Sequence, residues 1–127
     1  MIKNNQPNNQ TAFLRGNDFR RTYNERVLPF EVVRSKFRQF MDSKRKDPRQ
    51  PWGASDKPFT PGGNFANQVP NLKHAHLTPD LSIVYLATGN AVYLYGFYTH
   101  DDLGTGQPPK QPRQKAMSVK FRNTQFG

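Results

Sequence analysis

The chain has 127 residues and carries 19 Lys and Arg against nine Asp and Glu, which gives a formal net charge of +10. This length suits one compact domain, and a hydrophobic share of 34% with ten Phe and five Tyr is enough for a small aromatic core. There is no Cys, which excludes disulfide scaffolds, thiolate zinc sites and cysteine nucleophiles. The charge favours a polyanionic partner, either nucleic acid or an acidic protein.

Segment composition divides the chain into three parts. Residues 1–10 are polar and rich in Asn and Gln, so we expect a flexible N-terminal segment. Residues 11–106 form the predicted domain, and residues 107–127 form a Pro-rich basic extension in which 115–122 are a candidate closing helix. No apolar run reaches the roughly 18 residues of a membrane span, and no secretory signal is visible. We therefore expect a cytoplasmic protein without membrane contact.

The first half of the domain predicts a strand and two helices. Residues 11–15 are a candidate strand, and Asn17 and Asp18 offer N-cap oxygens to a first helix. That helix presents apolar residues at a spacing of four, namely Phe19, Tyr23 and Val27. After Pro29, a second helical stripe is predicted to face the core, consisting of Phe30, Val33, Phe37 and Phe40.

The second half predicts a loop followed by a β-meander. Residues 49–71 contain four Pro and three Gly and are interpreted as a long loop. Three extended runs follow at 72–78, 82–88 and 91–99, with the last two joined by Gly89-Asn90, a strong hairpin signal. The predicted fold is α+β, a small antiparallel sheet of about four strands with the two N-terminal helices packed on one face.

The hairpin turns predict which side chains share a face. A two-residue turn at Gly89-Asn90 pairs Tyr85 with Leu94 and Ile83 with Gly96, and a Pro79-Asp80 turn pairs His76 with Ile83. Side-chain alternation then predicts one face with His74, His76, Ile83, Tyr85, Leu94, Tyr98 and His100. The opposite face, against the helices, is predicted to hold Leu77, Val84, Leu86, Tyr93, Tyr95 and Phe97. His76 and His100 would lie about 10 Å apart at the backbone, so that their imidazoles could flank one phosphate.

Most of these residues also have an ordinary structural interpretation. A single histidine on a half-buried strand is more often structural. Three histidines on one face of a basic protein favour a functional site and a structural role about equally. Asp80 alone would be a turn former, and His100-Asp101-Asp102 would more often cap a turn than bind a metal ion. Lys44-Arg45-Lys46 fits either a solvated helix end or a contact with RNA backbone. Tyr85 and Tyr98 fit either core packing or base stacking.

Two motifs resemble the RelE/ParE toxin superfamily, and in particular its YafQ-like branch. They are HAHLTPDLSIVY at 74–85 and THDDL at 99–103. The resemblance implies a RelE-like fold and an endoribonuclease toxin, an mRNA interferase that cuts mRNA on the ribosome and is silenced by an antitoxin. It places His76, Asp80 and His100 on catalytic positions. The branch also has a loop histidine, absent from residues 57–67 here, and aromatic residues where this chain has Leu81 and Gly104.

Ribonuclease chemistry of this kind needs few groups. The 2′-OH of RNA is the nucleophile, so we expect His100 as general acid and His76 or Asp80 as general base. Lys57 or Lys73 would neutralise charge on the phosphate. The other candidate RNA contacts are His74, Tyr85, Tyr98, Lys44, Arg45 and Lys46. No metal or cofactor is required, and the expected partners are mRNA, the ribosome and an acidic antitoxin. The alternatives are a gyrase-blocking ParE-like toxin and an RNA- or ribosome-binding protein that does not cleave.

Overall fold

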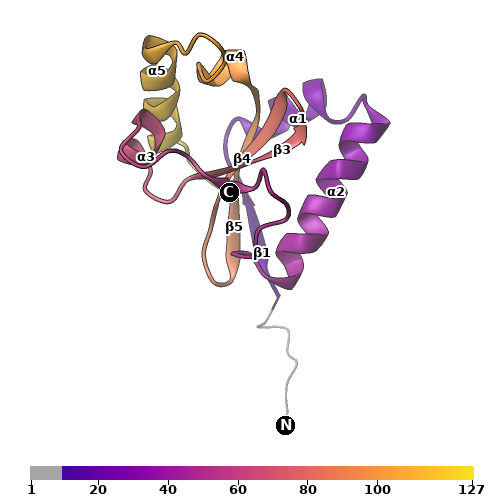
Figure 1. Ribbon diagram of the computed structural model, residues 1–127. Coiled ribbons are helices and arrows are strands. Elements are labelled where there is room, and N and C mark those ends of the chain that lie inside the picture. Colours follow the sequence, from indigo (N-terminus) through magenta and orange to yellow (C-terminus); the bar gives the residue numbers. More distant parts are fainter. Residues whose placement is uncertain (1–9) are drawn as a thin grey trace.

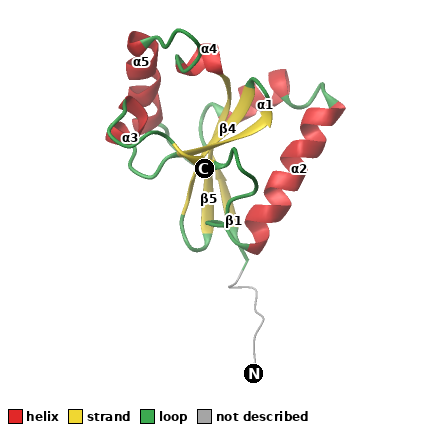
Figure 2. Cartoon of the chain, in the orientation of Figure 1, coloured by secondary structure: helices red, strands yellow, loops and turns green. Residues whose placement is uncertain are grey.

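The computed structural model describes residues 10–127, so the expectation for residues 1–9 lies outside the described residues. Figure 1 and Figure 2 show a sheet between two groups of helices. The elements are β1 (Ala12–Arg15), α1 (Phe19–Arg26), α2 (Glu31–Lys46), β2 (Lys57–Pro58), α3 (Asn64–Gln68), β3 (Lys73–Thr78), β4 (Leu81–Ala87), β5 (Ala91–Thr99), α4 (His100–Leu103) and α5 (Gln111–Arg122).

The five strands form one sheet in the order β1-β5-β4-β3-β2. The predicted α+β class is confirmed, but the sheet is mixed, because β1 runs parallel to β5 whereas the other pairs are antiparallel. Three helices and β2 separate β1 from the meander, so no tight turn dictates its direction. The fifth strand is β2, which lies with α3 inside the segment 49–71. The prediction that this segment is only a loop was therefore wrong.

Each face of the sheet is covered by its own apolar cluster. On one face, α1 and α2 supply Phe19, Val33 and Phe40 to a core that includes Ile83 and Leu94 of the sheet. This confirms the predicted position of the two N-terminal helices. Phe30 is an exception, since it precedes α2 as its N-cap residue and is 54% exposed.

The second cluster ties the C-terminal helix to the sheet. Phe65 of α3 and Phe121 of α5 pack with Val84, Tyr95 and Tyr98 on the face opposite α1 and α2. Phe121 is only 2% exposed, so α5 is docked on the body rather than free. The helix begins at Gln111, earlier than the predicted residue 115, because a Pro at its first turn is compatible with helical geometry.

The strand register agrees with the prediction near the Gly89-Asn90 turn and departs from it further away. Tyr85 pairs with Leu94 as predicted, but a β-bulge between Val84 and Tyr85 then pairs Ile83 with Phe97 instead of Gly96. Gly96 has a φ of 156°, and a Cβ there would lie 2.7 Å from the hydroxyl of Tyr98. The bulge thus occurs where only Gly fits.

A second irregularity, in β3, also changes the predicted faces. Thr78 pairs with Leu81 across the predicted Pro79-Asp80 turn, but a register shift between His76 and Thr78 then pairs His76 with Ser82 rather than Ile83. The predicted assignment of faces was therefore wrong for most of β4 and β5. The helix-side core contains Ile83, Tyr85 and Leu94, and the opposite cluster contains Val84, Leu86, Tyr93 and Tyr95.

Candidate active site

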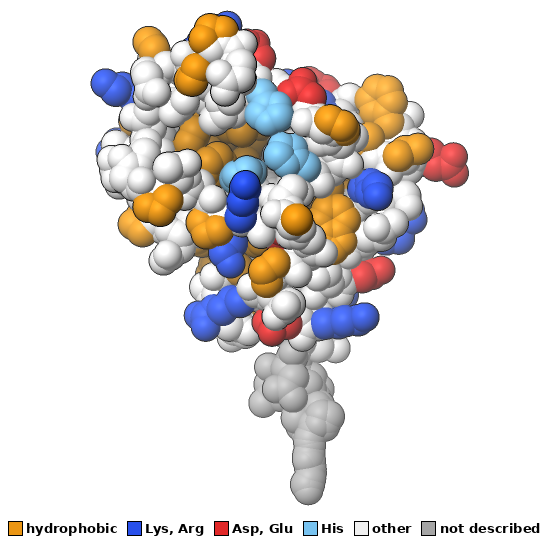
Figure 3. All heavy atoms as spheres, in the orientation of Figure 1, with side chains coloured by type: hydrophobic (Ala, Val, Ile, Leu, Met, Phe, Trp, Pro, Cys, Tyr) orange, Lys and Arg blue, Asp and Glu red, His pale blue; other side chains and the backbone are white. Residues whose placement is uncertain are grey.

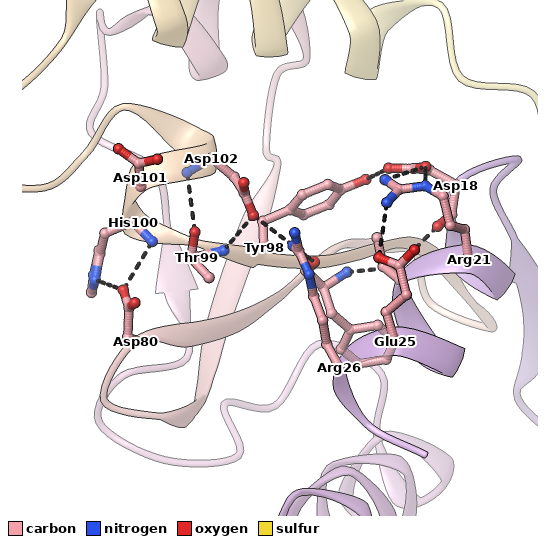
Figure 4. Close-up of polar contacts among 12 residues, drawn as sticks. Asp18, Arg21, Glu25, Arg26, Asp80, Tyr98, Thr99, His100, Asp101 and Asp102 are labelled. Carbon is pink, nitrogen blue, oxygen red and sulfur yellow. Dashed lines mark hydrogen bonds and ion pairs between the residues drawn. The ribbon is translucent and has the colours of Figure 1, made fainter. Parts of the chain in front are cut away.

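His100 is placed by a helix start rather than by a strand. The hydroxyl of Thr99 accepts a hydrogen bond from the Asp102 backbone N–H at 3.1 Å, and the Asp102 carboxylate accepts one from the Thr99 N–H at 3.0 Å. This reciprocal capping box ends β5 and makes His100 the first residue of α4 (Figure 4). The Thr-x-x-Asp spacing at 99–102 is the sequence signal for it.

Asp80 fixes the orientation of the His100 ring. It lies in the β3–β4 turn, and its Oδ1 lies 3.1 Å from the backbone nitrogen of His100 and 2.8 Å from the ring Nδ1. The bonds from the backbone N–H of His100 and then from its ring lower the pKa of Asp80. An ionised Asp80 accepts from Nδ1–H and so leaves the His100 Nε2 directed away from the carboxylate.

His76 completes a pair of imidazoles. Its Nε2 lies 3.3 Å from the Nε2 of His100, and the ring centroids are 5.3 Å apart. Burial, and then the neighbouring charges of His100 and Lys57, lower the pKa of His76. The two Nε2 atoms contact each other favourably when one carries a proton and the other accepts it. The geometry thus provides a proton donor next to a proton acceptor.

His74 and Lys57 border this pair, and Figure 3 shows the histidines gathered on one face of the molecule. Lys57 pairs with His74 across β2 and β3 and is exposed. The His74 ring lies against Phe59 at a centroid distance of 4.4 Å, and burial lowers its pKa to about 4. Lys73 alternates with His74 along β3 and therefore lies on the face of Ala75. Of the two predicted phosphate lysines, only Lys57 adjoins the histidines.

Three predicted RNA contacts are buried. The ammonium of Lys44 is 2.7 Å from Asp56 Oδ2 and 2.7 Å from the Gln50 carbonyl oxygen, and its side chain has 0% exposure. The hydroxyl of Tyr85, also fully buried, donates to the other oxygen of Asp56. Tyr98 is 3% exposed, and its hydroxyl donates to Asp18 at 2.7 Å.

The predictions that Lys44, Tyr85 and Tyr98 contact RNA were therefore wrong, because carboxylates from distant segments hold their polar atoms inside the fold. Asp18 consequently makes no N-cap bond to α1. Arg45 and Lys46 are exposed, so their contact with RNA stays a prediction.

Several supporting residues escaped the sequence analysis. Ser55 accepts a hydrogen bond from the backbone N–H of His76 at 3.2 Å. Arg26 of α1 donates to the Phe97 carbonyl at 2.8 Å and contacts the Asp102 carboxylate at 2.5 Å, which ties α1 to α4 (Figure 4). These contacts join residues far apart in the chain, and no local motif announces them.

Comparisons with known proteins identify the fold. No protein-family model and no curated protein sequence matches the chain. Among solved structures, a copper-bound mutant toxin from Helicobacter pylori has a TM-score of 0.57 at 19% identity, over 73% of this chain and 98% of that one. YafQ in the E. coli DinJ–YafQ toxin–antitoxin complex has a TM-score of 0.57 at 16% identity, over 74% and 97%. A metal-bound toxin from H. pylori has a TM-score of 0.51 at 20% identity, over 74% of this chain and 98% of that one.

This chain therefore has the fold of the YafQ toxin, which confirms at the level of the fold the resemblance seen in its motifs. Within residues 10–127, no helix is long and apolar enough to cross a membrane. In the same range, no three or more His, Cys, Asp or Glu side chains are arranged to hold a metal ion.

Proposed function

We propose that this protein is the toxin of a toxin–antitoxin pair and that it cleaves mRNA as a metal-independent endoribonuclease, acting on the ribosome in the cytoplasm. The fold shared with YafQ, which was solved in complex with the antitoxin DinJ, supports the first part. The observation that carries the second is the series of contacts from Asp80 to His100 and from His100 to His76.

In the proposed reaction, His76 is the general base. Its lowered pKa keeps the imidazole neutral near pH 7, so its Nε2 can accept the proton of the RNA 2′-OH. The 2′-oxygen then attacks the adjacent phosphorus, which forms a 2′,3′-cyclic phosphate and breaks the bond from phosphorus to the 5′-oxygen. His100 Nε2–H gives its proton to that departing oxygen. One proton is taken up and one is released, so the step balances.

Asp80 is better suited to positioning His100 than to acting as base. Its Oδ1 already accepts from both the backbone N–H and the ring of His100, which holds the ring in place. Lys57 next to His76 would neutralise charge on the phosphate. Since the two Nε2 atoms are 3.3 Å apart, a phosphate can lie between them only if RNA binding separates the rings.

A translation reaction with mapped mRNA ends tests the proposal. The protein is expected to produce new ends with a 2′,3′-cyclic phosphate and a 5′-hydroxyl. In a separate reaction with purified protein and naked RNA, EDTA is expected to leave the cleavage rate unchanged. His100→Gln and His76→Gln should each slow cleavage roughly 10²- to 10⁴-fold. Asp80→Asn should lower the rate as well, whereas its matched control Asp42→Asn, at an exposed site on α2, should cut at the parent rate.

Other outcomes would assign the fold a different role. A His100→Gln protein that cuts as fast as the parent would remove His100 from the reaction. Loss of naked-RNA cleavage in EDTA would contradict a metal-free mechanism. Tight, salt-dependent RNA or ribosome binding without new ends would identify a non-cleaving binding protein. Inhibition of gyrase supercoiling without either effect would identify a gyrase-directed toxin.

The proposed antitoxin is an acidic protein. The net charge of +10 supports its acidity, and the DinJ–YafQ complexes support a protein partner for this fold. We expect the product of an adjacent small acidic reading frame to copurify with this chain and to block cleavage. Their association rate should fall steeply as salt is added. A neighbouring product that neither binds nor blocks cleavage would contradict the pairing.

A further inference from the structure

A cavity beside His100 has no part in the reaction described above. Its volume is about 330 Å³, which is within the range of small-ligand pockets. One wall comes from the candidate site and the other from the segment that connects α4 to α5. Its lining includes Asp80, His100, Asp101, Gly106, Gln107 and Lys110.

The connecting wall is fastened at both ends. The Thr105 N–H donates to the carbonyl of His100 at 3.0 Å, and the Lys110 N–H donates to the carbonyl of Gly104 at 2.9 Å. Gly104 has a φ of 72°, and a Cβ there would come within 2.6 Å of the Lys110 carbonyl oxygen. The segment 104–110 is therefore a closed loop held against α4, and the cavity is formed before any ligand arrives.

This cavity lacks the excess of positive charge that the protein has as a whole. Asp80 and Asp101 line it with two carboxylates, whereas Lys110 brings one ammonium, 3.3 Å from Asp101. In Figure 4 Asp80, His100 and Asp101 lie together, apart from the Arg26 contact. Two carboxylates disfavour a phosphate but accept hydrogen bonds from N–H groups. A neutral ring with amino hydrogens fits this lining better than an anion.

The place of the cavity along an RNA strand follows from the role of His100, and this step rests on the proposed function. If His100 protonates the departing 5′-oxygen, the nucleotide that owns this oxygen lies beside His100. That nucleotide is the one that follows the cut. Gly106 borders the same residue, since a Cβ on it would lie 3.7 Å from the Cβ of His100.

We propose that this cavity binds the base of the nucleotide following the scissile phosphate, and that it prefers adenine, cytosine or guanine to uracil. The preference arises because the first three bases carry an exocyclic amino group that can donate to Asp101 or Asp80, and uracil has none. The amide of Gln107 adds one donor and one acceptor for the base edge. Nearly the whole of YafQ is matched by only 74% of this chain, so part of this chain lies outside the shared fold.

Binding of RNA that cannot be cut tests the cavity directly. The probes are short oligoribonucleotides whose 2′-hydroxyls are all methylated, with a single abasic site moved along the strand. One abasic position should weaken binding to the parent protein about tenfold, as expected for loss of one held base. Uracil at that position should bind more weakly than the three amino-bearing bases.

Three variants give the test its controls. Gly106→Leu fills the cavity and should abolish the effect of the abasic site, whereas Gly89→Leu, where a Cβ meets nothing within 4 Å, should behave as the parent. Asp101→Ala, which removes the acceptor oxygens, should weaken the discrimination against uracil. This variant provides the test if Gly106→Leu fails to fold. Parent protein that is indifferent to every abasic position, or a folded Gly106→Leu protein that still discriminates, would overturn the cavity assignment.

The two proposals fail in different ways. Cleavage of unmodified mRNA by a protein that shows no abasic effect would overturn the base pocket and leave the nuclease standing. An abasic effect without cleavage would overturn the nuclease and support a base-binding cavity on a non-cleaving protein.

Discussion

The buried pair of Lys44 and Asp56 allows a sharp test of what holds the second half of the chain in place. The Lys44 ammonium touches Asp56 and the Gln50 carbonyl and lies 4.9 Å from the centre of the Tyr85 ring. Burial lowers the pKa of Lys44, and Asp56 opposes that shift. Lys44→Met keeps most of the side-chain volume but removes the charge.

The expected loss is large because the carboxylate stays behind. Asp56 is 5% exposed and would retain only the hydroxyl of Tyr85 and the backbone N–H of Trp52 as donors. Removing one partner of a buried ion pair costs about 3–5 kcal/mol, a large part of the roughly 5–15 kcal/mol that stabilises a domain. Lys44→Met combined with Asp56→Asn should regain part of the loss, since no buried charge is then left unpaired.

Urea unfolding followed by fluorescence measures this loss. Trp52 is the only Trp in the chain and packs edge-on against Phe40, so its emission reports on this region. Arg45→Met is the matched control, because the exposed ion pair of Arg45 with Asp42 is worth about 0–1 kcal/mol. A loss below about 1 kcal/mol for Lys44→Met would refute the reasoning that this charge is enclosed and paired.

Two further perturbations follow from residues around the sheet. The pKa of His74 is about 4 in the fold against about 6.5 when unfolded, so the unfolded chain binds more protons in this window. The free energy of unfolding should therefore fall by about 2 kcal/mol as the pH drops from 6.5 to 4, and a His74→Gln protein that shows the same fall would contradict this cause. Gly96→Ala should destabilise by about 2 kcal/mol or more, because it adds a Cβ at a positive φ and against the Tyr98 hydroxyl. Gly89→Ala is its control, and equal urea midpoints for the two proteins would show that Gly96 is not required.

The meeting of His76, Asp80 and His100 was predictable because two short hairpin turns fix which ends of β3, β4 and β5 lie together. The Gly89-Asn90 hairpin brings the far ends of β4 and β5 to fixed partners, and the β3–β4 turn then places Asp80 at His100. The finer pairing was not predictable by counting from the turns, since the bulge at Gly96 shifts every pair beyond it. A Gly inside a strand is the only hint of such a shift in the sequence.

The burial of Lys44 shows a different limit of prediction from sequence. At the end of a basic helix it is indistinguishable by pattern from Arg45 and Lys46, and all three suit the solvent or a phosphate. Only the path of the following loop, which brings Asp56 beneath the helix, turns one of them inward. Helical periodicity gives the direction of a side chain from its own axis, but it carries no information about a charge that arrives from another segment.

The parallel pairing of β1 with β5 also governs when this protein becomes complete during synthesis. Ala12 pairs with Ala91, and Gly16 forms a bridge with Phe126, so β1 waits for partners that are translated much later than itself. Contacts this distant in sequence form slowly, because the chain loses the entropy of closing a long loop before the contacts stabilise the fold. In a nascent chain, β1 therefore stays unpaired until the residues of β5 have left the ribosomal tunnel.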